Sequence, residues 1–172
     1  CRCASSSAGP EQRGRFGALN APGCLYTCRM ADSLRFEVPT PLDYFAMLVV
    51  DDASLSLVEA AASIGQDAHA PLDVQAVLAE IDALATRLKR RVAADAVPLH
   101  RLRLLNRFFF QDLGFAGNVN HYHDPRNSYL HEVLRSRRGI PITLAVLYIE
   151  LAQQIGLQAQ GVSFPGHFLI KL

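Results

Sequence analysis

The chain has 172 residues, half of them apolar, and a formal net charge of +1. This length suits one domain with a substantial core, and no apolar run is long enough to span a membrane. The near-neutral charge argues against a nucleic-acid-binding domain, which usually presents a basic face. We therefore expect a soluble, cytoplasmic protein with neither membrane nor nucleic-acid partners.

The first 29 residues differ from the rest of the chain. They contain four arginines, one glutamate and all four cysteines, without a periodic apolar pattern. They also lack the apolar core of a secretory signal. We interpret residues 1–29 as a disordered or non-native upstream extension, and residues 30–172 as the folded domain. The spacing of Cys1, Cys3, Cys24 and Cys28 matches zinc sites only weakly, so we predict no metal site there.

Three helices are expected in the first half of the domain. The first follows Thr40, a capping residue, and starts at Pro41, which suits the first helical turn. A second, short helix is capped by Ser54 and ended by Gly65. The longest helix opens at residues 70–71 and closes on the basic residues 89–91, where cations suit the negative end of the helix dipole.

Two further helices flank a polar segment. One helix starts at Pro98 and ends at Gly114, and we expect Leu99 and the phenylalanine pair at 108–109 to face the core. The other starts at Pro125, directly after a polar stretch that extends from residue 117 to residue 124. We interpret the aromatic residues as core packing.

The final third changes character. Residues 141–155 are apolar on most sides, which predicts a buried central helix. Residues 159–164 and 168–172 fit two strands joined through a Pro-Gly turn. The sequence thus predicts an α+β fold, mostly helical, with a small antiparallel sheet. Two strands are a marginal sheet, and the last is still apolar at Leu172, so we expect the domain to be incomplete at its C-terminus.

The densest group of potential metal ligands is His121, His123, Asp124 and His131. His-x-His on an extended segment would direct both rings to one face, and a first-row metal could accept them together with Asp124. However, no fourth ligand has a recognisable spacing, and Asp124 can cap the following helix. We favour a polar loop and predict no metal and no other cofactor.

Three arginines, Arg135, Arg137 and Arg138, precede Gly139. They could bind an anion near the positive start of the following helix. They could equally be solvated residues at the C-terminal end of the preceding helix. We favour the second interpretation.

The segment from Gly139 onward has the layout of a thiol-enzyme active site without a thiol. Such enzymes pair a cysteine at a helix start with a histidine. Here Pro141 starts the helix and His167 heads the last strand, but no cysteine follows Cys28. Thr143 and Ser136 carry nearby hydroxyls, which need a base to act as nucleophiles. The one candidate catalytic residue is therefore His167, as a remnant.

Three stretches carry a family resemblance: Asp-Pro-Arg-Asn-Ser-Tyr-Leu at 124–130, Arg-Arg-Gly-Ile-Pro-Ile-Thr-Leu at 137–144, and Gly-Val-Ser-Phe-Pro-Gly-His-Phe-Leu at 161–169. In this order they resemble the bacterial SirB-type family, whose N-terminal transglutaminase-like domain is commonly followed by tetratricopeptide-like helices. The resemblance implies a papain-like, transglutaminase-type frame with a central helix on an antiparallel sheet. It places Pro141 at the position of the nucleophilic cysteine and His167 at that of the histidine.

The resemblance and the missing nucleophile favour a noncatalytic binding or regulatory module. Its cleft around Pro141, Thr143 and His167 would hold a segment of a protein or peptide partner, or a small ligand. We expect no thiol-dependent transglutaminase or protease activity. The alternative is a hydrolase or acyltransferase that uses a hydroxyl such as that of Thr143 with His167 and a carboxylate from beyond Leu172.

Overall fold

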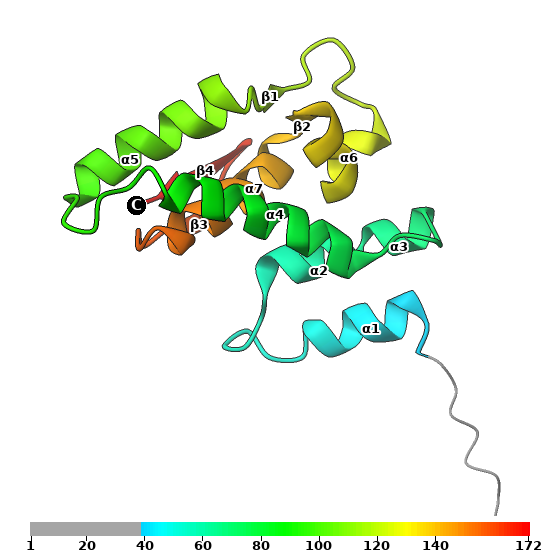
Figure 1. The fold of residues 1–172 in the computed structure, drawn as a ribbon. Helices are drawn as coiled ribbons and strands as arrows, with labels where there is room; N and C mark the ends of the chain where they lie inside the picture. The colour runs from blue at the N-terminus through cyan, green and yellow to red at the C-terminus, as the bar shows by residue number, and fades with distance from the viewer. Residues whose placement is uncertain (1–38) are drawn as a thin grey trace, which may run out of the picture. The chain divides into compact units, whose positions relative to one another are not determined.

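The fold is described for residues 39–172 in a computed structural model, shown in Figure 1. Our prediction about residues 1–29 lies outside the described residues. The described part is mostly helical with small sheets, which confirms the α+β class at this coarse level. Its elements, in chain order, are α1 (Pro41–Leu48), α2 (Leu57–Ser63), α3 (Gly65–Ala68), α4 (Val74–Lys89), α5 (Pro98–Asn106), the π-helical segment η1 (Arg107–Asp112), β1 (Ala116–Gly117), the 3-10 turn η2 (Pro125–Ser128), α6 (Leu130–Ser136), β2 (Arg138–Gly139), α7 (Pro141–Gln154), β3 (Gln160–Phe164) and β4 (His167–Lys171).

Helix α7 is the centre of the core, as the sequence predicts. It contacts α2, α4, α5, α6 and both strands of the C-terminal hairpin, and Figure 1 shows it enclosed by these elements. Apolar side chains point in most directions around its axis, so every neighbour finds an apolar face to pack against. Its buried residues are Thr143, Ala145, Val146, Leu147, Tyr148, Ile149, Leu151 and Ala152.

Helix α1 begins where the sequence places it. The Thr40 hydroxyl accepts a hydrogen bond from the Asp43 backbone N–H at 3.2 Å, and the Asp43 carboxylate accepts one from the Thr40 N–H at 3.0 Å. This reciprocal pair is a capping box, which satisfies two backbone donors that the helix itself leaves unpaired. The predicted cap and the proline start are therefore confirmed.

Two other helix starts were predicted wrongly. Ser54 does not cap α2, because its hydroxyl donates to the Asp51 carboxylate at 3.0 Å, and the helix starts only at Leu57. Gly65 does not end the helical segment either, because the short helix α3 begins at this residue. Helix α4 starts at Val74 rather than near residue 70, because the Asp73 carboxylate caps it through two backbone N–H groups.

Helix α5 starts at Pro98 as predicted but changes its geometry at Arg107, where it widens into η1. Phe108 and Phe109 are fully buried there, as expected. Leu99 is 57% exposed, so its predicted inward direction is wrong. The positive φ of 71° at Gly114 lets the chain turn away after η1.

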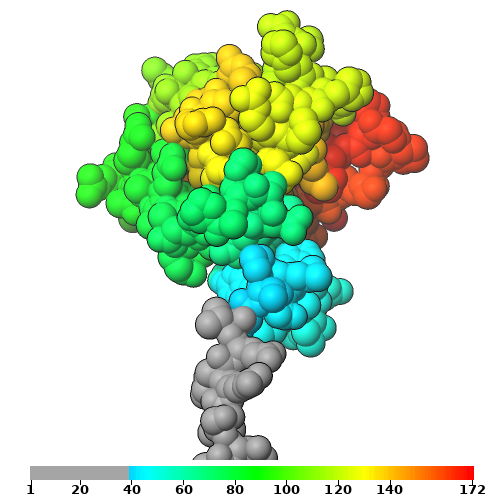
Figure 2. Space-filling view, turned by 90° about the vertical axis from the view of Figure 1, so that its right-hand side faces the viewer, coloured from blue at the N-terminus to red at the C-terminus, as the bar shows by residue number. Residues whose placement is uncertain are grey.

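The predicted hairpin is confirmed. Strands β3 and β4 pair antiparallel, with Val162 opposite Leu169 and Phe164 opposite His167. Figure 2 shows this hairpin, in red, at one edge of the molecule beside the yellow surface of the preceding loop and helix. A second sheet was not predicted: β1 and β2 form a parallel pair of two residues each, in which Gly117 lies opposite Gly139.

The described helices are short relative to a bilayer. The longest is α4, with 16 residues, whereas a spanning helix needs about 20 apolar residues. Of the helices between residues 39 and 172, none has both the length and the apolarity that a membrane crossing requires.

Candidate functional site

Pro141 and His167 line the same open pocket. The pocket has a volume of about 330 Å³ and lies between the start of α7, the turn of the β3–β4 hairpin and the loop that carries Tyr122. His167 is exposed, so its imidazole is accessible to solvent and to ligands. The lining residues are Tyr122, Ile140, Pro141, Ile142, Gly166, His167, Phe168 and Leu169. The wall is therefore mainly apolar, with the imidazole of His167 and the Tyr122 hydroxyl as its polar side-chain groups.

A second hollow of about 500 Å³ shares Pro141 and Phe168 with this pocket. It lies between α5, η1, α7 and β4. The Tyr148 hydroxyl donates to the Asn106 side-chain oxygen at 2.6 Å in its wall. Burial raises the pKa of Tyr148, so the phenol stays neutral at physiological pH. The two hollows together form an apolar surface with few polar groups.

The entry into α7 is tightly packed. Gly139 belongs to β2, and a Cβ atom at this position would lie 2.9 Å from both Thr143 Oγ1 and Val133 Cγ2. Glycine therefore allows β2 to approach α6 and α7 closely. Pro141 then takes the first helical position, where its missing N–H costs no hydrogen bond.

Thr143 does not line the pocket, contrary to our prediction. Its side chain is buried, and its hydroxyl lies 2.8 Å from the Asn127 carbonyl oxygen and 3.0 Å from the Ile140 carbonyl oxygen, in position to donate to either. The other candidate hydroxyl, on Ser136, lies 2.8 Å from the Glu132 carbonyl oxygen at the end of α6. Both hydroxyls are therefore placed to donate hydrogen bonds to backbone carbonyl oxygens.

Asn127 organises the loop beside the pocket, a role that the sequence did not reveal. It is 3% exposed. Its side-chain N–H groups donate to the carbonyls of His121 at 2.7 Å and Tyr122 at 3.1 Å, and its side-chain oxygen accepts from Asn118 at 2.9 Å. Its own carbonyl accepts from the Ile140 N–H at 3.3 Å. Asn127 thus ties the Tyr122 loop to the start of α7.

Comparison with known families identifies the superfamily of the chain. A sequence model of the transglutaminase-like superfamily matches residues 75–172, which is more than half of the chain. The chain belongs to the transglutaminase-like superfamily. The match includes Pro141, His167 and every other residue that lines the two hollows.

Similar proteins include bacterial and mammalian relatives. UPF0162 proteins of Xylella fastidiosa and Vibrio cholerae are 39% and 29% identical over 127 and 122 residues, covering 74% and 71% of this chain. Each match spans 45% of the relative's own length, so less than half of those proteins is represented. F-box only protein 21 of Homo sapiens is 40% identical over 70 residues, which are 41% of this chain and 11% of that protein. No solved structure matches the chain at a significant level.

The suspected ligand group at residues 121–131 is not brought together in the transglutaminase-like domain. Residues 120–123 form a turn instead of the extended segment we assumed for His121 and His123. Asp124 caps η2 and pairs with the Arg126 guanidinium at 2.6 Å. These hydrogen bonds hold the pKa of Asp124 below its ordinary value.

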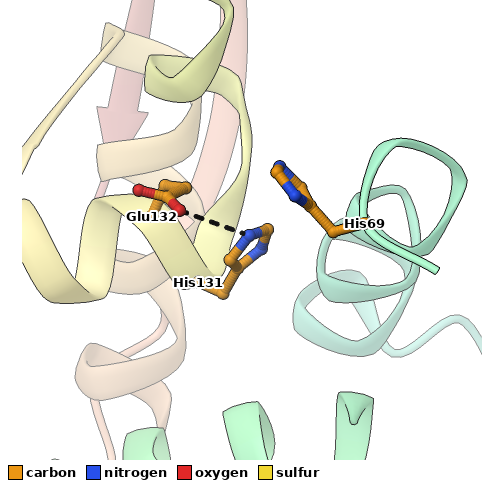
Figure 3. Close-up of side chains that lie close together, drawn as sticks. All are labelled: His69, His131 and Glu132. Atoms are coloured by element: carbon orange, nitrogen blue, oxygen red, sulfur yellow. Dashed lines mark ion pairs between the residues drawn. The ribbon is translucent and has the colours of Figure 1, made fainter. Parts of the chain in front are cut away.

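His131 instead lies beside His69 and Glu132, neither of which we predicted to be a ligand. His69, His131 and Glu132 each offer one potential ligand atom, and these atoms lie within 4.8 Å of one another. Figure 3 shows His69 approaching from the α3 side and the other two residues from α6. The sequence carries no signal for this group, because His69 is 62 positions before His131 and belongs to no motif.

The three arginines in the last turn of α6 and just after it have partners within the domain, although Nη1 of Arg137 is buried without a hydrogen-bond partner among the described residues. Arg135 pairs with Glu132 at 2.5 Å, and Arg138 donates to the Gly114 carbonyl at 2.7 Å. The Arg137 guanidinium lies 4.9 Å from the centre of the Phe115 ring and 3.7 Å from Glu80. These contacts support the structural interpretation over an anion site.

The stability of the domain is expected to fall on acidification because of His131. Burial is the main cause that lowers the pKa of His131; His69 and Arg135 lower it further, and Glu132 opposes them. With a folded-state pKa below the unfolded value of about 6.5, stability is complete above that value and is lost as the pH falls below it. Chemical denaturation at pH 7.5 and pH 5.5, in a chelating buffer, measures this loss.

The variant for this test is His131→Phe, which keeps a ring but cannot titrate, and its stability should depend less on pH than that of the wild type. The control is His100→Gln, at an exposed position of α5, which should keep the wild-type dependence. Equal pH dependence in all three proteins would show that His131 is not the responsible group.

Proposed function

We propose that this transglutaminase-like domain is a noncatalytic binding module that holds an extended peptide segment of a protein partner beside Pro141 and His167. The observation that carries the proposal is a proline at the start of α7, in the wall of the pocket that His167 also lines. Proline has no group that can attack a carbonyl carbon, and a covalent mechanism needs such a group. In this proposal the transglutaminase-like fold is retained, and the pocket binds a partner instead of catalysing a reaction.

The chemistry of the surface suits an extended peptide with apolar side chains. The pocket and the adjoining hollow are lined mainly by apolar residues, and both include Pro141 and Phe168. Within residues 39–172, β3 and β4 pair only with each other, so no other strand of this segment pairs with their outer edges. An added peptide strand pairs with such an edge, while its alternate side chains enter neighbouring pockets.

The surrounding protein is part of the same proposal. On the resemblance to the SirB type, we infer a cytoplasmic protein whose domain is followed by tetratricopeptide-like helices. The related segment makes up 45% of the Xylella relative and 11% of the human one. Recurrence in proteins of such different length is typical of a module that supports several architectures.

A hydroxyl-dependent hydrolase or acyltransferase is a weaker candidate. Thr143 is 7% exposed, and its hydroxyl lies within hydrogen-bond distance of two backbone carbonyls. A nucleophilic hydroxyl needs access to its substrate and a base within reach. The access condition is not met at Thr143, and the partners of its hydroxyl are backbone carbonyls rather than a base.

The proposal is tested by selecting binders from a displayed library of random peptides with the full chain. Selected peptides should bind Ile142→Asp at least about tenfold more weakly, a loss of about 1.4 kcal/mol, because this residue lines the pocket and is 47% exposed. An acid in the first turn of a helix is tolerated, so the variant should fold. The control is Val119→Asp, at a residue that is 88% exposed and lines neither hollow.

A parallel screen for amide hydrolysis and acyl transfer should show no turnover. Turnover that disappears in His167→Ala would replace the binding proposal with an enzymatic one. Failure to select any peptide, or equal binding by Ile142→Asp and wild type, would also overturn it.

A further inference from the structure

The cluster of His69, His131 and Glu132 has the composition of a metal site. The Nε2 atom of His131 lies 3.8 Å from Oε1 of Glu132, and His69 completes a group whose ligand atoms lie within 4.8 Å of one another (Figure 3). Two imidazoles and one carboxylate are a donor set that zinc uses, with the fourth position open to solvent. The group shares no residue with the Pro141–His167 pocket.

The ligands are held by short, well-defined backbone segments. His69 terminates α3, where its N–H donates to the Gly65 carbonyl at 3.0 Å and its carbonyl accepts from the Leu72 N–H at 2.8 Å. His131 and Glu132 belong to the first turn of α6. All three side chains are half-buried, so their orientations are restricted before any ion binds.

Each ligand side chain also has a neighbour that limits its movement. Glu132 uses Oε2 for the Arg135 ion pair at 2.5 Å, which leaves Oε1 on the side of His131. The His131 ring packs edge-on against the His69 ring at 4.9 Å, and Tyr129 lies 6.0 Å from it in a stacked orientation. These contacts restrict the directions in which the Glu132 and His131 side chains can turn.

Close packing at Gly65 holds the His131 ring from the other side. A Cβ atom at residue 65 would lie 2.9 Å from Nδ1 of His131, so a larger residue would displace the ring. Nδ1 is buried and has no hydrogen-bond partner among the described residues. The accessible ligand atom of this imidazole is therefore Nε2, the atom that lies near Glu132.

We propose that His69, His131 and Glu132 bind one divalent transition-metal ion of the zinc class and thereby fasten α3 to α6. Ligand atoms around a tetrahedral zinc lie about 3.4 Å apart, given bonds of about 2.0–2.2 Å. The three ligand atoms here all lie within 4.8 Å of one another, so binding requires an adjustment of at most about 1.4 Å per pair, which side-chain rotation supplies. Imidazole favours zinc, copper, nickel and iron over calcium or magnesium.

The test uses the full chain with Cys1, Cys3, Cys24 and Cys28 replaced by serine, because cysteines are themselves zinc ligands. After chelator treatment, titration with Zn²⁺ alone should show one equivalent bound and an increase in the thermal unfolding midpoint. Co²⁺ should occupy the same site and give a visible absorption spectrum of a four- or five-coordinate ion.

Two variants and one control separate metal binding from packing. His69→Ala and Glu132→Gln should each weaken Zn²⁺ binding at least about tenfold, whereas His100→Ala, at an exposed residue of α5, should not. Glu132→Gln conserves size, so it reports on the ligand even if His69→Ala folds poorly. The proposal is overturned if the cysteine-free chain binds no stoichiometric Zn²⁺, or if Glu132→Gln binds it as tightly as the parent.

Discussion

Leu147→Ala is expected to lower the free energy of unfolding by about 2–5 kcal/mol. Leu147 is 1% exposed and lies in the part of α7 that the other helices surround. Truncation to alanine removes three side-chain carbons from the core, and the cavity adds to the loss because the neighbouring helices relax only partially. Urea denaturation monitored by circular dichroism measures the change.

The matched control is Leu99→Ala on α5. The chemical change is the same, but Leu99 is 57% exposed, and alanine is at least as good a helix former as leucine. We expect a change within about 0.5 kcal/mol. Losses of similar size at both positions would mean that α7 is not the centre of the core.

Asn127→Ala is expected to cost about 1–3 kcal/mol and to weaken peptide binding as well. The substitution removes the donors to the His121 and Tyr122 carbonyls and the acceptor for Asn118. The stability loss arises because buried polar groups lose their partners. The binding loss follows because Tyr122 lines the pocket.

Asn127→Asp gives a sharper test, since it keeps the size and one acceptor of the side chain. At neutral pH it places a carboxylate oxygen against two carbonyl oxygens, so it should destabilise at least as much as alanine. Its deficit should shrink as the pH falls, because a protonated carboxyl can donate again. The control, Asn120→Ala at an exposed position, should have little effect. A neutral result for Asn127→Asp would refute the assigned hydrogen bonds.

Features of the fold that depend on local patterns were predictable. The Thr40 cap of α1, the proline start and apolar faces of α7, and the β3–β4 hairpin each involve residues within a few positions of one another. Such signals act in the unfolded chain as well as in the folded one. The central helix could therefore be predicted from the sequence alone, and so could the interest of Pro141 and His167 as candidate site residues.

Two of the errors arose where several local signals compete. Serine is a favourable N-cap residue, but the Ser54 hydroxyl donates its hydrogen bond to the Asp51 carboxylate instead. Pro71 signals a helix start, but α4 begins only after Asp73, whose carboxylate accepts hydrogen bonds from two backbone N–H groups of the first turn. Propensity cannot rank such alternatives, because their energies differ by less than the contribution of packing.

Long-range features left no trace in the sequence. The His69 group and the β1–β2 pair join segments that are distant along the chain. The positive φ of 60° at Arg137 is also unexpected for a residue with a long side chain. Arg137 is the C-cap of α6, where a left-handed residue commonly ends a helix, and its guanidinium lies 4.9 Å from the centre of the Phe115 ring.

The position of α7 has a consequence for how the domain is made. Helix α2 packs on α7, yet about 80 residues separate them, which a ribosome needs about 4–16 s to add. During this interval α2 and α4 can pack on each other, but the parts of their apolar faces that contact α7 have no permanent cover. Nascent chains in this state expose surface that associates with other molecules. The domain is therefore expected to depend on chaperones during synthesis more than a bundle of sequential helices does.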